Sequence, residues 1–92
     1  MEVKRENYIT VQGWMVTDLG LRGNELLLYA LIYGFSQADD ARFTGSVKYV
    51  TSWLGCSRRS AITYISNLCD AGLVEKTSEV INGVTFNYLG LS

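Results

Sequence analysis

The sequence predicts one small α+β domain, mainly helical, in which the helices come first and a β-hairpin comes last. Three observations carry this prediction. The 92 residues are 48% hydrophobic, so even a chain this short has the apolar side chains for one dense core. Glycine and small polar residues divide its middle into segments of helical length. Asn82 and Gly83 are the strongest two-residue signal for a hairpin, because a type I′ turn needs a positive φ at both positions.

The composition argues against several classes of protein. The chain contains no His, which removes His-based acid–base catalysis, the Ser-His and Cys-His nucleophile pairs and His metal sites. With no paired carboxylates and no phosphate loop either, we expect no enzyme activity and no cofactor. The longest apolar run, residues 26–33, is far too short to span a bilayer, and the N-terminus lacks the apolar stretch of a secretory signal. We therefore expect a cytoplasmic protein without a membrane partner.

The two cysteines are expected to be free. Cys56 and Cys69 form no CxxC motif and have no other soft metal ligand nearby, so a metal site is not expected. The mostly helical segment between them would hold their Cα atoms beyond the ~7 Å that a disulfide tolerates. We interpret both as small apolar side chains in a reducing compartment.

The first third of the chain predicts an extension followed by a long helix. Within an N-terminal extension over residues 1–20, residues 8–11 alternate weakly and predict a short strand. Residues 13–19 suit a short helical turn that ends at Gly20. A long helix is then expected from Arg22 or Gly23 to about Ser36. It is apolar nearly all round, which is typical of a helix that is central in its domain or faces a second chain.

Residues 46–71 predict two helices joined by a tight turn. Ser46 is a good N-cap for a helix over 47–54, and Gly55 suits a left-handed C-cap. Ser57 then caps a second helix, expected over 58–71. A polar loop with Asp39 and Asp40 and a short strand over 42–44 are expected before this pair, and strands over 73–81 and 84–91 after it.

This order of elements is that of the winged helix-turn-helix. In that arrangement two helices pack across a turn, the second of them lies exposed for the major groove, and the hairpin is the wing. We therefore expect residues 1–92 to form a single domain with a three-helix core and a C-terminal wing over 73–91.

The residues of the pair also resemble a known family. The pattern resembles bacterial winged helix-turn-helix domains, and it is especially similar to the N-terminal DNA-binding domains of phage and plasmid replication initiator, or replisome-organiser, proteins. The stretch Gly13-Trp14-Met15 and the Gly23-Asn24-Glu25-Leu26 start of the long helix are also similar to those proteins, although Arg22 stands where they have a capping Ser. The pattern reads Ser46-x-x-x-Val50-Thr51-x-x-Leu54-Gly55-Cys56-Ser57-x-x-Ser60-Ala61-x-x-x-Ile65-x-x-Leu68-x-x-Ala71-Gly72-Leu73-Val74. The resemblance implies duplex DNA and replication proteins as partners.

The distribution of charge favours DNA binding in the middle of the chain. Although the net charge is −1, residues 41–68 contain four basic residues and no acidic one, whereas both flanking segments are net acidic. Arginine offers a planar fork of donors to phosphate or guanine, and hydroxyl groups donate to phosphate. The candidate DNA-binding residues are Ser57, Arg58, Arg59, Ser60, Thr63 and Asn67 on the second helix of the pair, Lys48 and Tyr49 on the first, and Lys76 and Asn82, with Ser78, on the wing.

Two alternatives stay open at this point. A winged helix can also serve protein–protein contact or dimerisation, which the acidic wing favours, and related domains occur in transcription regulators. Ile62 and Cys69 occupy positions that are usually polar in this family. We expect the N-terminal segment to cover both, within a well-filled core that also takes Trp14, Trp53, Phe86 and Tyr88. A homodimer surface on the N-terminal segment or the long helix is the alternative.

Overall fold

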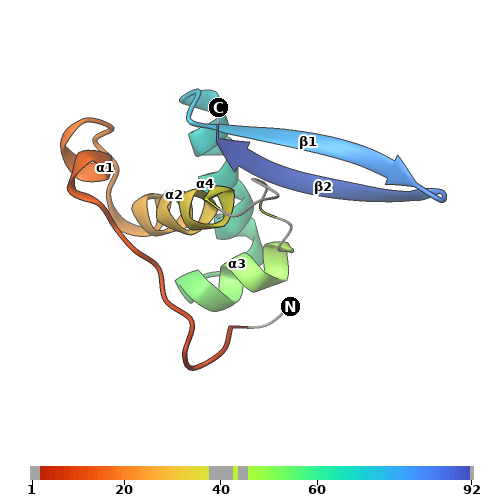
Figure 1. Ribbon diagram of the computed structural model, residues 1–92, viewed down its shortest axis with the longest axis horizontal. Helices are drawn as coiled ribbons and strands as arrows, with labels where there is room; N and C mark the ends of the chain where they lie inside the picture. Colours follow the sequence, from red (N-terminus) through yellow and green to blue (C-terminus); the bar gives the residue numbers. More distant parts are fainter. Residues whose placement is uncertain (1–2, 38–42, 44–45, 92) are drawn as a thin grey trace.

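The fold is a helical body with a projecting hairpin (Figure 1). The computed structural model describes residues 3–37, 43 and 46–91. The described elements are α1 (Gly13–Thr17), α2 (Gly23–Ser36), α3 (Val47–Leu54), α4 (Arg58–Asp70), β1 (Val74–Ile81) and β2 (Val84–Leu91). The two strands pair in an antiparallel sheet and form the wing. The predicted architecture, mainly helical with a C-terminal wing, is confirmed.

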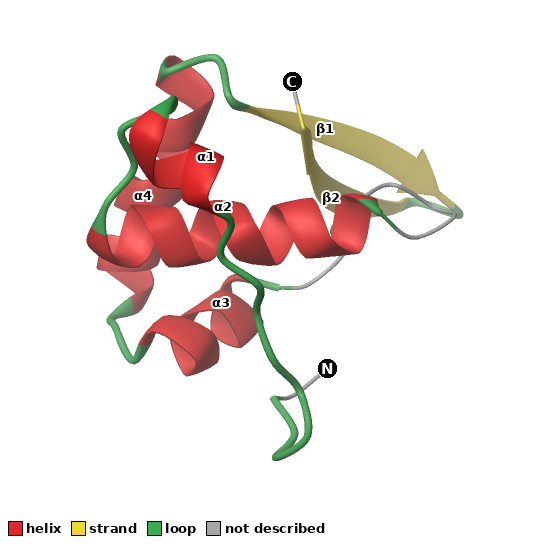
Figure 2. Cartoon of the chain, turned by 60° about the vertical axis from the view of Figure 1, so that its left-hand side comes forward, coloured by secondary structure: helices red, strands yellow, loops and turns green. Residues whose placement is uncertain are grey.

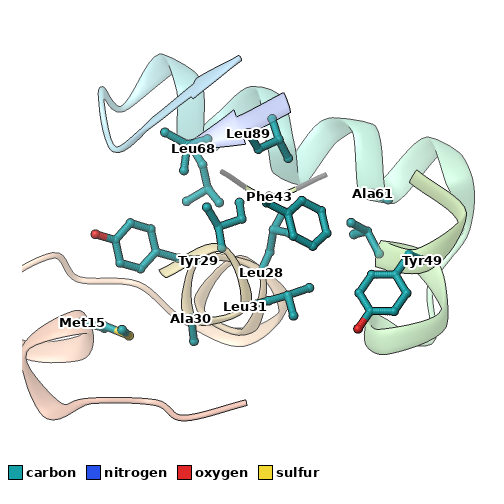
Figure 3. Close-up of a cluster of buried hydrophobic side chains, with 13 residues drawn as sticks. Met15, Leu28, Tyr29, Ala30, Leu31, Phe43, Tyr49, Ala61, Leu68 and Leu89 are labelled. Atoms are coloured by element: carbon teal, nitrogen blue, oxygen red, sulfur yellow. The ribbon is translucent and has the colours of Figure 1, made fainter. Parts of the chain in front are cut away.

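Helix α2 is the centre of the body, and the other elements pack around it (Figure 2). Its residues 28–32 are all buried, which explains why its sequence is apolar on nearly every side. The cluster in Figure 3 is completed by buried side chains from α1, α3, α4, the base of the wing and the bridge position before α3. These are Met15, Phe43, Tyr49, Val50, Ala61, Leu68, Val74 and Leu89.

Serine side chains set where the paired helices begin, as predicted. The Oγ of Ser46 accepts a hydrogen bond from the backbone N–H of Tyr49 at 3.1 Å, and the Oγ of Ser57 accepts one from Ser60 at the same distance. Gly55 ends α3 with φ 62° and ψ 35°, the left-handed C-cap. Each bond satisfies a backbone donor that the first helical turn leaves without a partner.

The ends of the other helices follow the same local rules. Arg22 precedes α2 without capping it through its side chain, which confirms that the usual serine cap is lost. Helix α4 ends at Asp70, one residue before the predicted end, and Ala71 is its C-cap. The hairpin turn has φ 52° at Asn82 and φ 80° at Gly83, the positive pair that a type I′ turn requires.

The expected strand over residues 8–11 is wrong. This segment is extended but pairs with no strand among the described residues, and Tyr8 at its start is 82% exposed. Weak alternation favours an extended backbone, but a strand also needs a neighbouring edge to pair with. The segment lies instead against residues 30–35 of α2, with a shallow pocket between them.

The short strand expected over 42–44 is reduced to a single bridge in the described residues. Phe43 pairs with Leu89 of β2, whereas Arg42 and Thr44 lie outside the described residues, as do Asp39 and Asp40.

The expectation of a fully filled core around Ile62 and Phe86 is also wrong. Ile62 is 45% exposed and Phe86 is 44% exposed. The reason is that Ile62 lies on the face of α4 turned toward the wing, whereas the N-terminal segment runs along α2. The other residues named with them are half-buried: Trp14, Trp53 and Cys69 against the core, and Tyr88 on the wing. The thiols of Cys56 and Cys69 are free.

The described residues contain neither a membrane-spanning helix nor a cluster of possible metal ligands. None of the helices there combines the length and the apolar character needed to cross a membrane. Within the same residues, no three His, Cys, Asp or Glu side chains gather as a possible metal site.

Candidate nucleic-acid interface

The start of α4 presents the candidate residues in a fixed frame. Ser57 caps the helix, and its hydroxyl also donates to the Oγ of Ser60 at 3.1 Å. Ser57 is therefore used largely by the protein itself, while the hydroxyl hydrogen of Ser60 stays available to an outside acceptor. Arg58 and Arg59 follow directly and are both exposed.

Helix geometry separates the exposed side chains of α4 into two stripes. Residues four apart lie one above the other on a helix, and adjacent residues point about 100° apart. Arg59, Thr63 and Asn67 form one stripe, which is exposed along its whole length. Thr63 donates its hydroxyl to the backbone oxygen of Arg59 at 3.1 Å, so toward a ligand it acts as an acceptor. Three of the predicted candidates on this helix therefore share one outward stripe.

The second stripe faces the wing. Arg58, Ile62 and Ser66 line a groove of about 410 Å³ between α4, the start of α3 and the wing. Lys76 of β1 and Asn87 of β2 line the same groove from the other side. The structure thus brings Arg58 and Lys76, which are 18 positions apart in the sequence, to one concave surface.

The two faces of the wing differ in charge. Lys76 and Ser78 share the side of β1 that carries the buried Val74, because side chains alternate along a strand. Glu75 and Glu79 lie on the opposite side. The wing therefore turns Lys76 and Ser78 toward the groove, and its acidic residues away from it.

The two candidate residues on α3 differ in exposure. Lys48 is exposed, as expected for a residue that faces the DNA backbone. The expectation that Tyr49 lies beside it on the surface is wrong, because Tyr49 is only 5% exposed and its ring centroid lies 6.0 Å from that of Phe43 and 6.5 Å from that of Trp53. Adjacent helical positions point about 100° apart, so an outward Lys48 places its neighbour inward. Tyr64, the next residue after Thr63 on α4, packs against the core.

On the wing, Asn82 is exposed at the tip, whereas Lys76 lies near the base. Sequence reasoning missed Asn87 and Ser66 as groove residues. The hydroxyl of Ser78 donates to Oδ1 of Asn87 at 2.8 Å across the hairpin, so the amide hydrogens of Asn87 remain as its donors. Counting the hairpin register back from Asn82-Gly83 would have placed Asn87 opposite Ser78, on the face of Lys76.

An exposed, basic second helix after a tight turn, with a hairpin beside it, defines a winged helix-turn-helix protein. The chain belongs to the family described as "Helix-turn-helix domain", whose sequence model matches residues 19–74. The match runs from the residues before α2 to the first residue of β1, and thus contains the whole helix pair.

A solved structure described as "N-Terminal domain of DNA binding protein" is similar in fold. It superposes with a TM-score of 0.66 over 96% of this chain and 76% of that chain, at 16% sequence identity. No curated protein matches the chain.

Proposed function

We propose that this chain is a duplex-DNA-binding domain that places α4 in the major groove. The observation that carries the proposal is the outward stripe of Arg59, Thr63 and Asn67, which combines a planar cation, an acceptor and an amide on one exposed helix face. The fold similarity to a domain described as belonging to a DNA-binding protein supports it. This is a binding role rather than a catalytic one.

The distribution of charge along α3 and α4 also supports DNA binding by α4. Along α3 and α4, Lys48, Arg58 and Arg59 are exposed, and the single acidic residue, Asp70, is the last residue of α4. The first half of α4 is therefore the half suited to approach a polyanion. Since few cations are concentrated there, we expect modest affinity for a single domain and a shallow dependence on salt, with a slope of log K of about −0.9 per phosphate neutralised.

A direct test compares two double variants in fluorescence anisotropy with a labelled random-sequence duplex at two salt concentrations. R58A/R59A is expected to abolish binding. R5A/R22A removes the same charge from exposed positions outside α3, α4 and the wing, and is expected to keep most of the affinity. Both should melt near the parent, because surface changes are usually within about ±0.5 kcal/mol. Parental affinity in R58A/R59A would overturn the assignment of α4 and favour protein docking.

The biological setting that we propose is replication initiation on a phage or plasmid. Its support is the resemblance of the helix pair, and of the stretches around Trp14 and Asn24, to replication initiator domains. Replication proteins are the expected partners. Selection of bound fragments from the genome that encodes the chain tests this setting: enrichment of a replication origin supports it, whereas enrichment of promoters would indicate a transcription regulator.

A homodimer through the N-terminal segment is a second proposal, supported by one observation. The extended residues 8–11 have no strand partner among the described residues, and Tyr8 and Val11 are 82% and 42% exposed. Pairing of two such segments would satisfy their backbone groups. Sedimentation equilibrium of the parent and of V11D tests it: a dimer that dissociates in V11D supports the interface, and a monomeric parent contradicts it.

A further inference from the structure

We propose that the groove between α4 and the wing seats one sugar–phosphate strand of the bound duplex, with Arg58 and Lys76 as its phosphate ligands, whereas Arg59 reads bases. This inference rests on the proposed DNA-binding function and assigns different roles to two adjacent arginines. It also adds Asn87, which the sequence did not single out.

The two arginines are separated by the helix itself. Arg58 lines the groove together with Ile62 and Ser66, but Arg59 is absent from the residues that line it. Because adjacent residues point about 100° apart, Arg59 projects from the outward stripe while Arg58 projects toward the wing. Arg59 is therefore placed to enter a DNA groove, whereas Arg58 is placed to contact the backbone beside that groove.

The groove has the polarity that a DNA strand requires. Its cationic lining residues, Arg58 and Lys76, come from opposite walls, and the described residues that line it include no Asp or Glu. Both cations are exposed, so they reach a ligand without being uncovered first. Asn87 adds amide donors, and the apolar side chain of Ile62 matches the uncharged face of a deoxyribose. Phosphate oxygens are the usual acceptors for such cations and amides.

The geometry of B-DNA supplies the reason for a single strand. A major groove and the adjacent minor groove are separated by one sugar–phosphate backbone, since each groove is bounded by the two strands of the duplex. With α4 in the major groove, the wing that stands beside α4 lies across one of the two backbones that bound that groove. The concave surface between α4 and the wing is where this backbone passes.

The acidic side of the wing agrees with this orientation. Glu75 lies on the strand face opposite Lys76, and the register pairs Lys76 with the buried Leu89. Only the groove side of the wing therefore faces the phosphates. Lys76 can therefore bind a phosphate even though the wing as a whole is net acidic.

The proposed division of labour predicts two kinds of defect. Loss of a phosphate ligand weakens binding to all sequences alike and lowers the salt slope by about 0.9, whereas loss of a base-reading residue relaxes discrimination between sequences. We expect R58A and K76A to lose roughly 10-fold in affinity on every duplex. We expect R59A to narrow the difference in affinity between a preferred duplex and its single-base variants.

The experiment starts from a duplex selected by the parent chain from a pool with a randomised centre. Affinities of the parent, R58A, R59A and K76A are measured on it, on its single-base variants and over a salt series, with R22A as the control for loss of one exposed charge. Methylphosphonates then replace single phosphates of each strand in turn. We expect that neutralising certain phosphates lowers the affinity of the parent but not that of R58A. Neutralising certain others should lower the affinity of the parent but not that of K76A. All of these phosphates should lie on one strand, within a few nucleotides of one another.

The outcomes separate the inference from the function on which it rests. If the parent binds no duplex, the proposed function itself fails. If the parent binds but R58A alters base preference as R59A does, or K76A matches R22A, the groove assignment is wrong while DNA binding stands. The groove assignment is also wrong if the methylphosphonates that leave the affinity of R58A unchanged and those that leave the affinity of K76A unchanged lie on different strands. Circular dichroism melts of each variant check that all are folded.

Discussion

Phe43 and Leu89 exchange two backbone hydrogen bonds, of 2.7 and 3.0 Å, and so join the base of the wing to the helical body. The ring centroid of Phe43 lies 4.9 Å from that of Phe35 on α2, and Phe43 is 1% exposed. Residues 75–87 of the wing, by contrast, are all exposed. This bridge therefore anchors the base of the wing, which forms one wall of the groove, to the helical body.

Truncation of Phe43 should destabilise the whole domain. F43A removes a buried ring from the contact of α2, α3 and β2, and cavities of this kind cost about 3–5 kcal/mol. F86A removes the same ring from a position that is 44% exposed, and should cost less than about 1 kcal/mol. Urea unfolding measures both, and similar midpoints for the two variants would contradict the assigned core.

Gly83 should be required for its backbone angle and not for space. A Cβ added there meets nothing within 4 Å, but φ is +80°. G83A should therefore weaken the hairpin by about 1–2 kcal/mol, the cost of a left-handed conformation for an ordinary residue. Gly13 has the same open surroundings but no positive φ, so G13A should be neutral or slightly stabilising. Native-state hydrogen exchange of the wing amides measures the effect, and equal protection in the two variants would refute it.

Ser57 should separate stability from DNA binding. S57A removes the N-cap of α4 and should cost about 1 kcal/mol. S57D keeps an acceptor for the N–H of Ser60, so its stability should return to that of the parent. The new carboxylate precedes Arg58 and Arg59, however, and should weaken DNA binding. Thermal melts and anisotropy measure the two effects, and an S57D as unstable as S57A would show that Oγ does not act as a cap.

Tyr29 should make the domain less stable in alkaline solution. Burial raises the pKa of Tyr29 above its ordinary value of about 10, and the neighbouring Tyr33 adds to the shift. The unfolded state then releases this proton first, so the contribution of Tyr29 is present below about pH 10 and is lost as the pH rises through the folded-state pKa.

The measurement is the free energy of unfolding against pH for the parent and Y29F. The parent should lose more stability than Y29F above about pH 10. Y8F, at an 82% exposed position, should follow the parent. Parallel curves for the parent and Y29F would contradict the shift.

Local chemistry made most of the fold predictable. The boundaries of α3 and α4 follow from Ser46, Gly55 and Ser57, which act on backbone groups within four residues of themselves. The hairpin follows from the backbone angles that Asn82 and Gly83 accept. The outward stripe of α4 follows from helical spacing as soon as the helix is placed. All of these are interactions between near neighbours in the chain, so the sequence by itself determined them.

Only the tertiary structure decided which side chains meet across elements. Tyr49 is buried because Phe35 of α2 and Phe43, which both lie outside α3, pack against it. Residues 8–11 form no strand because no strand edge among the described residues lies beside them. Arg58 shares a groove with Lys76 because the wing packs beside α4. Such relationships depend on the packing of elements far apart in sequence, and neither spacing nor propensity along one segment contains that information.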